Sequence, residues 1–198
     1  MTPPTLEVWR VEATTDGDFA PLLGADERAR AQRFAFAADR DRFVLRRGVR
    51  RALLAAHPRA ACSVSSTPGE VVVAVARGTA VGVDVERPRD GRERLYARVC
   101  SPREQAALRR DGDLFLTLWT RKEAVLKLLG VGLARPPATL DVLVPGPLAV
   151  PEPVWLRDLP GALPAAVACA RRPQWLRIVR ATAAGGVLAC VEETVVDA

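Results

Sequence analysis

Apolar and polar positions alternate along the chain in two patterns, which predict strands and helices in both halves. Short β-branched or apolar runs are typical of strands, and apolar residues spaced three or four apart are typical of helices. Strands are expected at 6–11, 71–76, 81–85, 140–144, 165–170, 175–180 and 187–191, and helices at 26–36, 39–56, 92–99, from 101 onward and at 113–129. Because Gly78 provides a turn between two of these runs, 71–76 and 81–85 predict a β-hairpin.

The order of the elements predicts an α+β fold. Helices and strands come in groups and do not alternate one by one, as they would in a parallel α/β sheet. Each half supplies helices and antiparallel strands. We therefore expect two similar subdomains related by a pseudo-twofold, residues 1–79 and residues 80–198, the second carrying the candidate site described below.

Three helix ends can be predicted from local chemistry. Ser101-Pro102-Arg103-Glu104 has the serine, early proline and third-position glutamate of a capping box. Gly130 is expected to end the helix that begins near residue 113. His57, which stands before Pro58, is expected to end the second helix.

Composition narrows the class of protein. The chain has 198 residues, of which 49% are hydrophobic, and no run reaches the 18 or so apolar residues of a spanning helix. No secretory signal is visible at the N-terminus. The four cysteines form no CxxC pair, which favours reduced thiols and a cytoplasmic protein. His57 is the single histidine, so a multi-histidine zinc site is not expected.

The net charge of +6 indicates an anionic partner. Arginines alternate with acids, as at 39–42 and 86–90, and aromatic residues are few. Since a nucleic-acid surface is typically an unbroken basic patch with aromatics, we do not expect nucleic acid or a membrane as partner. Of 29 basic residues only two are lysine, Lys122 and Lys127, and they lie within six residues of each other. That clustering marks a place in the chain where an ammonium group is required, or it is chance.

Two short segments carry candidate chemistry. Asp84 lies on the strand at 81–85 and Glu86 follows its end, and because they are two residues apart in an extended segment they point to one face. On the helix at 113–129, Glu123 shares a face with Trp119 and Lys127. Each has a plain alternative: a strand edge facing water, and a surface ion pair contributing about 0.3–0.5 kcal/mol.

The apolar surroundings of Glu123 favour burial, and a buried acid normally has a partner or a function. If the helix packs beside the strand, three carboxylates converge. Each like-charge pair at about 4 Å costs about 4 kcal/mol at an effective dielectric near 20, so the cluster needs a cation or raised pKa values. Oxygen ligands without histidine or cysteine select Mg²⁺ or Mn²⁺, and a nearby lysine would bind phosphate. The residues themselves thus indicate metal-assisted phosphoryl-type transfer.

The two motifs together resemble a known family. Gly-Val-Asp-Val-Glu at 82–86, followed at a matching distance by Glu123 in Trp-Thr-Arg-Lys-Glu-Ala-Val-Leu-Lys at 119–127, is similar to the signature of the 4′-phosphopantetheinyl transferase superfamily. The aspartate-x-glutamate form and the chain length resemble its larger, monomeric, Sfp-type members. Ser-Pro-Arg-Glu at 101–104 and Gly-Val-Gly-Leu at 130–133 also match in place.

The resemblance implies an activity and roles for residues. It implies transfer of phosphopantetheine from coenzyme A to a serine of an acyl or peptidyl carrier protein, with release of 3′,5′-ADP. Asp84, Glu86 and Glu123 would hold Mg²⁺, and Glu123 would also take the serine proton. Lys127 would contact the attacked phosphate. Glu104 matches an acidic position suspected of assisting deprotonation, although a capping-box role is the alternative. The +6 charge suits an acidic carrier.

Departures from the family pattern leave coenzyme A binding open. Where the family usually has asparagine-x-serine-histidine-serine/threonine, this chain has Ser63-Val64-Ser65-Ser66-Thr67, with Ser66 in place of the histidine. The preceding glycine-lysine/arginine-proline segment is missing. Candidates for binding coenzyme A are Ser65, Ser66, Thr67, Lys127, Arg30 and Arg42, with Arg46 and Arg59 as further cations. For each arginine the alternative is a solvated surface residue.

Two other functions remain as alternatives. One is a non-catalytic relative that binds coenzyme A or a carrier through the altered phosphate-binding segment. The other is a basic nucleic-acid-binding domain, which would bind DNA with a steep salt dependence.

Overall fold

The structure is a computed structural model that describes residues 3–12, 19–89, 91–143, 153–184 and 186–198. Within these ranges no helix combines the length and hydropathy that crossing a membrane requires. In chain order the elements are β1 (Thr5–Glu12), η1 (Ala20–Leu22), α1 (Ala25–Ala31), α2 (Ala37–Ala56), β2 (Ala61–Thr67), β3 (Glu70–Arg77), β4 (Val81–Val85), η2 (Glu93–Leu95), α3 (Tyr96–Val99), α4 (Pro102–Leu108), α5 (Leu114–Leu129), η3 (Gly132–Ala134), η4 (Pro137–Thr139), β5 (Trp155–Asp158), β6 (Ala165–Cys169), β7 (Trp175–Ala184) and β8 (Val187–Asp197).

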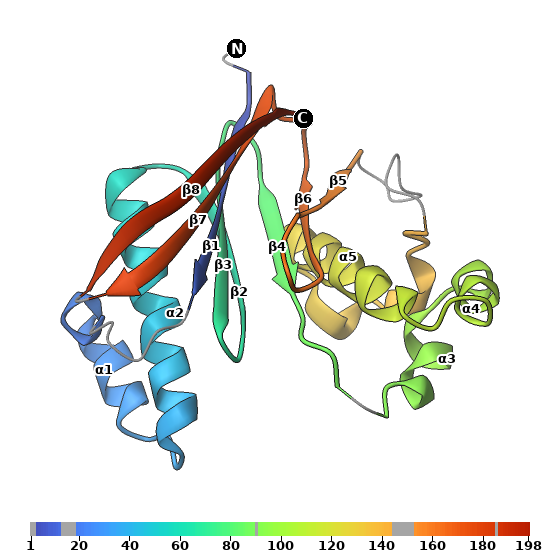
Figure 1. Ribbon diagram of the computed structural model, residues 1–198, viewed down its shortest axis with the longest axis horizontal. Helices are drawn as coiled ribbons and strands as arrows, with labels where there is room; N and C mark the ends of the chain where they lie inside the picture. Colours follow the sequence, from blue (N-terminus) through green and yellow to red (C-terminus); the bar gives the residue numbers. More distant parts are fainter. Residues whose placement is uncertain (1–2, 13–18, 90, 144–152, 185) are drawn as a thin grey trace.

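The larger sheet has five strands in the order β2-β3-β1-β7-β8 (Figure 1). Strand β1 runs antiparallel to β3 and parallel to β7, so that Val8 lies between Ala74 and Ile178. Helix α2 covers one face, where Val49 and Leu53 join Phe19 and Val73 in a buried cluster. The last two strands of the chain therefore complete a sheet whose other strands come from the segment that ends at Arg77.

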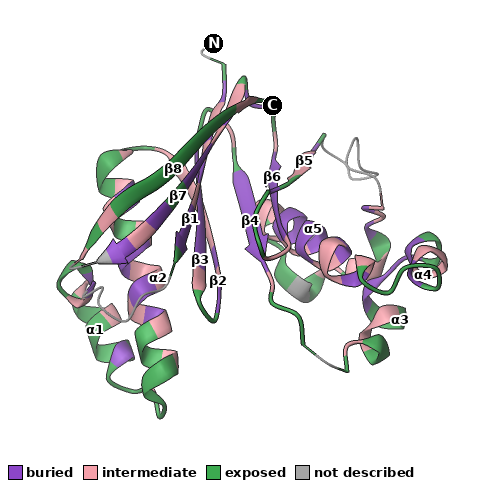
Figure 2. Cartoon of the chain, in the orientation of Figure 1, coloured by how far each residue is buried: buried purple, intermediate pink, exposed green. Residues whose placement is uncertain are grey.

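The smaller sheet has three strands in the order β4-β6-β5, and α5 packs on its outer face through Leu118, Val125 and Leu126. Its inner face packs against the larger sheet, with Val83 and Val167 meeting Leu6 in a shared core. Figure 2 shows this arrangement as buried residues on the facing strands and on α5, and exposed residues on the outer helices and on β8. The strand that joins the two layers is β4, which is buried on both faces.

The predicted α+β class is confirmed by the two sheets and their helices. The capping box is also confirmed: Ser101 Oγ accepts the Glu104 amide at 3.2 Å, and a Glu104 carboxylate oxygen accepts the Ser101 amide at 2.7 Å. Gly130 ends α5 in the left-handed conformation, and His57 ends α2. The division at residue 80 and the pseudo-twofold stay predictions.

The hairpin prediction is wrong. Strand β4 pairs with β6, with Asp84 opposite Ala166, while β3 pairs with β2 and β1. The position beside β3 is taken by β2, a serine-rich strand that the apolar pattern did not predict, and the chain crosses to the other sheet after Arg77. Strand β5 was also missed.

The strand expected at 140–144 is wrong over its described part, residues 140–143, which are irregular. Leu140 and Val142 are buried against α5, and this burial gives the apolar alternation. Their backbone groups are bonded by charged side chains and not by a neighbouring strand. Residue 144 lies outside the described residues.

The cysteines agree with the expectation of reduced thiols. Cys62, Cys100, Cys169 and Cys190 are all free. Burial raises the pKa of Cys100 to about 11 and that of Cys169 to about 12, so both remain protonated in the core.

Gly82 brings β4 close to α5. A methyl group at this position would lie 2.0 Å from the carbonyl oxygen of Ala124 and 2.5 Å from the amide nitrogen of Leu128. Both contacts are with helix backbone, which cannot turn aside, so Gly82→Ala is expected to lower the free energy of unfolding by about 1–3 kcal/mol. Urea unfolding measures the change. Gly112→Ala, where a methyl group meets nothing within 4 Å, is the control, and an equal effect of both substitutions would contradict the close packing.

Candidate active site

Asp84 is the centre of the candidate site. It lies on β4 and is 4% exposed. Its Oδ1 accepts hydrogen bonds from Ser65 Oγ and from Lys127 Nζ, both at 2.7 Å. Its other oxygen, Oδ2, is buried and has no hydrogen-bond partner among the described residues. Because a buried carboxylate oxygen without a donor is costly, this atom is a candidate ligand for a cation.

Glu86 follows the end of β4 and contacts two other elements. Its Oε1 accepts the indole N–H of Trp119 at 3.0 Å, which connects it to α5. Its Oε2 accepts a bond from Arg92 Nη2 at 3.0 Å. Both oxygens of Glu86 therefore have donors.

Glu123 and Lys127 come from one face of α5, as their spacing predicts. Lys127 Nζ donates to Asp84 and also to the carbonyl oxygen of Val83 at 3.0 Å, and its side chain is 31% exposed. Glu123 is half-buried. Its pKa is raised by burial and then by the charge of Asp84, with a smaller contribution from Glu86.

The pKa of Asp84 is also raised, because burial outweighs the opposing effects of Lys127 and Ser65. Glu86 raises it slightly further. The three predicted carboxylates thus interact electrostatically, and folding brings them together from two separate segments, the end of β4 and the middle of α5.

The fit of a divalent cation is partial. As the side chains stand, no three acidic, histidine or cysteine residues among those described form a group able to hold a metal ion. Arg92 and Trp119 occupy Glu86, whereas Asp84 Oδ2 is unpartnered and Glu123 carries a raised pKa. All donors present are oxygens, which fits a hard ion such as Mg²⁺. A metal held by all three would require Glu86 to exchange a present partner.

The hydroxyls of β2 divide between its two faces. Ser63 Oγ accepts the Val83 amide at 3.1 Å, and Ser65 bonds Asp84, so these side chains face β4. Thr67, on the same face, has a buried hydroxyl without a partner among the residues described. Since side chains alternate along a strand, Ser66 lies on the opposite face, where Val64 packs beneath α2. Ser65 and Thr67 thus belong to the surroundings of Asp84, and Ser66 is separated from them.

This separation predicts different effects of two serine substitutions. Ser65→Ala removes a donor from Asp84 and is expected to lower activity about tenfold or more, the range for residues that orient a metal or catalytic ligand. Ser66→Ala serves as the control and is expected to leave activity nearly unchanged. Steady-state rates of both variants measure the difference. A larger loss in Ser66→Ala would reverse the assignment of faces.

The predicted arginines form one cluster and one outlier. The pKa of Arg46 is lowered by burial and by the nearby charges of Arg47, Arg30 and Arg42, so these guanidinium groups lie close together on α1 and α2. Arg42 also pairs with Asp39, and Arg30 lies 5.4 Å from the centre of the Phe43 ring.

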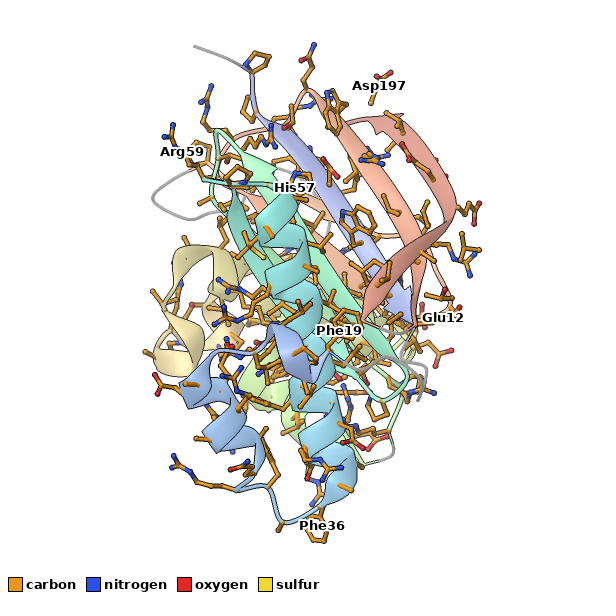
Figure 3. The ribbon with its side chains drawn as sticks, turned by 90° about the vertical axis from the view of Figure 1, so that its left-hand side faces the viewer. Glu12, Phe19, Phe36, His57, Arg59 and Asp197 are labelled. Atoms are coloured by element: carbon orange, nitrogen blue, oxygen red, sulfur yellow. The ribbon has the colours of Figure 1, made fainter. Side chains whose placement is uncertain are left out.

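Arg59 does not join this cluster. It follows the far end of α2 and adopts a positive φ of 67° (Figure 3). A helix the length of α2 separates it from Arg42 by roughly 20–30 Å.

Glu104 and Lys122 form a separate buried ion pair. Both side chains are 0% exposed, and Lys122 Nζ lies 2.7 Å from Glu104 Oε2. Glu104 also accepts the amides of Ser101 and Val142, while Lys122 donates to the carbonyl oxygens of Pro137 and Leu140. The capping prediction for Glu104 is confirmed. All its observed partners are structural donors, and none is Asp84, Glu86 or Glu123.

Two arginines with specific partners were missed by sequence reasoning, one at the site and one in the core. Arg92 holds Glu86, but it is one of several arginines in the segment after β4 and carries no distinguishing signal. Arg121 pairs with Asp158 at 2.6 Å and donates to the carbonyl oxygens of Val142 and Leu143. Its position within an apolar helix was the available signal, since a buried arginine needs partners.

The site's geometry agrees with two comparisons with known proteins. A family model described as the 4′-phosphopantetheinyl transferase superfamily matches residues 80–148, which contain Asp84, Glu86, Glu123 and Lys127. The 4′-phosphopantetheinyl transferase HetI of Nostoc sp. is 31% identical over 151 residues, covering 60% of this chain and 64% of the relative. The chain therefore spans less than two thirds of the curated relative's length. The resemblance predicted from the sequence is confirmed.

Proposed function

We propose that the chain is a 4′-phosphopantetheinyl transferase that moves phosphopantetheine from coenzyme A to a serine of an acyl or peptidyl carrier protein. The observation that carries this proposal is the buried Asp84, bonded to Lys127 and retaining an unpartnered oxygen, beside the half-buried Glu123. The comparisons support it over the stretch that holds these residues. In this reaction the serine oxygen bonds to the β-phosphorus of coenzyme A, and the bond from that phosphorus to 3′,5′-ADP breaks.

Asp84, Glu86 and Glu123 would hold Mg²⁺, or Mn²⁺ in its place. Such an ion supplies charge neutralisation to the phosphates when bound. In support, Asp84 offers a free oxygen, and burial, together with the neighbouring carboxylates, raises the pKa values of Asp84 and Glu123, a cost that a bound cation would offset.

Glu123 is proposed as the base that takes the serine proton. A general base works best when its pKa lies near the operating pH, and burial together with Asp84 moves Glu123 in that direction. Lys127 is proposed to contact the attacked phosphate. Its side chain is 31% exposed, so its ammonium group can reach a bound phosphate and stabilise developing charge.

The cations proposed to hold the coenzyme A phosphates are Arg30, Arg42 and Arg46. The pKa of Arg46 is lowered first by burial and then by the charges of Arg47, Arg30 and Arg42, and a bound polyanion would offset both effects. Ser65 and Thr67 are proposed as further contacts because their side chains lie on the Asp84 face of β2. Glu104 is proposed to act as a structural residue and not as a base. We further propose that the protein acts as a cytoplasmic monomer.

A non-catalytic coenzyme A- or carrier-binding relative is the second candidate. One observation favours it, namely that Trp119 and Arg92 occupy both oxygens of Glu86. In that reading the Glu86 contacts persist with coenzyme A bound, and the metal set is never completed.

One incubation tests these alternatives: the protein, a fluorescent coenzyme A, Mg²⁺ and an apo-carrier protein. Covalent label on the carrier is expected, and it should be lost with a chelator or in Asp84→Asn. Glu12→Gln, a carboxylate 67% exposed at the end of β1, is the matched control and should retain transfer. Tight binding of coenzyme A without labelling would favour the non-catalytic relative. DNA binding that falls steeply with salt, without labelling, would favour the nucleic-acid-binding domain.

A further inference from the structure

The turn between α1 and α2 exposes an aromatic side chain that no structural role accounts for. Phe36 is 72% exposed, more than the other large apolar side chains that the structure describes as exposed. It precedes α2, and its carbonyl oxygen accepts the amides of Asp39 and Arg40. That backbone role does not need a phenyl ring. In Figure 3 the labelled Phe36 lies at the lowest point of the molecule.

The same helical pair carries most of the chain's net positive charge. Residues 25–51 contain nine arginines and four carboxylates, whereas the whole chain has a net charge of +6. The carboxylates of Glu27, Asp39 and Asp41 are paired with arginines of this segment. Arg33, in the turn itself, is exposed and is in none of the ion pairs found among the described residues. The turn therefore presents an apolar side chain beside uncompensated positive charge.

This surface lies at the end of the molecule toward which β4, the strand that carries Asp84, runs. In Figure 1 the α1–α2 turn and the segment following β4 both lie at its lower end. Strand β4 runs toward that end and carries Asp84 near its last residue. Arg87, Arg89 and Arg94 in the following segment are also exposed. A macromolecule that spans from the turn to the segment following β4 would meet positive charge on both halves of the molecule.

We propose that the α1–α2 turn, residues 32–36, is the docking surface for the acceptor protein, with Phe36 as its apolar anchor and Arg33 as its charged contact. This inference rests on the proposed function. Charge complementarity requires an acceptor with carboxylates around the apolar patch that receives Phe36. A protein fits better than a membrane, because the apolar face of α2 is covered by its own sheet through Val49 and Leu53.

The test compares two double variants in steady-state kinetics with an apo-carrier protein. Phe36→Ser/Arg33→Glu is expected to raise the KM for apo-carrier about tenfold or more, as loss of an anchor and reversal of a charge would do. The KM for coenzyme A and kcat at saturating carrier should stay unchanged. The kcat/KM for carrier should fall less steeply with salt than in the wild type.

The matched control is Val187→Ser/Arg171→Glu, which makes the same chemical changes at exposed positions on β8 and after β6. An unchanged carrier KM in Phe36→Ser/Arg33→Glu, or an equal rise in the control, would overturn the docking surface while leaving the proposed function intact. A dimer that dissociates in Phe36→Ser would overturn it in favour of a second copy of this chain. Turn-dependent binding to phosphatidylserine vesicles, without a change in carrier KM, would overturn it in favour of a lipid surface.

If the wild type transfers no label, the proposed function fails separately. Docking is then read from the fluorescence polarisation of dye-labelled apo-carrier. Binding that is lost in Phe36→Ser/Arg33→Glu and kept in the control supports the surface. Absent binding, or equal binding by both variants, overturns it.

Discussion

A Glu123→Gln variant is expected to lose transfer activity and, at the same time, to unfold at a higher temperature than the wild type. Burial and the charge of Asp84, followed by that of Glu86, raise the pKa of Glu123 on folding. A carboxyl group with a raised folded pKa binds its proton more tightly in the folded state. Its ionised form therefore destabilises the protein above that pKa, and the cost disappears as pH falls to the unfolded value. Glutamine removes this cost at neutral pH.

The loss of activity and the rise in Tm each have an expected size. Removal of one general base lowers the rate by about 10²–10⁴-fold. Each kcal/mol of stabilisation raises Tm by about 2–4 °C in a chain of this length. The higher Tm of Glu123→Gln relative to the wild type should be seen near neutral pH. The difference should shrink as the pH falls toward the ordinary glutamate pKa of 4.5.

Label transfer in the presence of Mg²⁺ measures the loss of activity. Thermal unfolding without divalent ions measures the gain in stability, since a bound cation would cancel the repulsion. Glu12→Gln is the control, and it should change neither property. Retained activity in Glu123→Gln would contradict its role as the base. A lower Tm at neutral pH would contradict the conclusion that its ionised form destabilises the fold. The opposed changes separate a functional carboxylate from a structural one, whose loss lowers activity and stability together.

The face that α5 presents to the site followed from spacing. The i, i+4 relation places Trp119, Glu123 and Lys127 on one face, and in the structure Trp119 bonds Glu86 while Lys127 bonds Asp84. Local chemistry also determined the helix ends at Ser101 and Gly130. These features depend on residues within about one helical turn of each other, so the sequence carries them directly.

The partner of β4 could not be predicted in the same way. Periodicity assigned 81–85 to a strand and placed Asp84 on it, but β4 pairs with β6, which follows α5 and β5 in the chain. A nearby turn at Gly78 favoured the local hairpin. Two sheets that pack face to face satisfy burial equally well by sending β4 to the second layer, and apolar alternation does not distinguish the two pairings.

Assignments within β2 depended on a register that a motif match alone does not fix. The family pattern drew attention to Ser66, whereas Ser65 bonds Asp84. Because neighbouring residues of a strand face opposite sides, a difference of one position moves a side chain from the site to the layer beneath α2. The face of β2 that meets Asp84 became known only from the packing of β4 beside it.

Replacing Lys122 by methionine is expected to lower the free energy of unfolding by about 3–5 kcal/mol, because it leaves the buried Glu104 charge without its cation. Both side chains are 0% exposed. Lys122 also donates to the carbonyl oxygens of Pro137 and Leu140, and Glu104 accepts the Val142 amide, so the pair holds the irregular segment against α5. Lys122, although close to Lys127 in the sequence, thus pairs with Glu104 and not with Asp84, and its role is structural.

The double variant Glu104→Gln/Lys122→Met is expected to recover part of this loss, since neither charge remains buried alone. Urea unfolding of the two single variants, the double variant and Arg103→Gln completes the comparison. Arg103 is 73% exposed and 3.5 Å from Asp141, so its loss should cost about 0–1 kcal/mol. Additive losses in the double variant would contradict the coupling.

The pH profile of kcat in Glu104→Gln decides between a structural and a proton-transferring Glu104. Its two oxygens already accept the amides of Ser101 and Val142 and contact Lys122, so a structural Glu104 leaves the profile unchanged at lowered stability. If Glu104 removed the serine proton, one limb of the profile would be lost in this variant. In its structural role, the Glu104–Lys122 ion pair helps to position α5, and therefore Glu123 and Lys127, relative to Asp84.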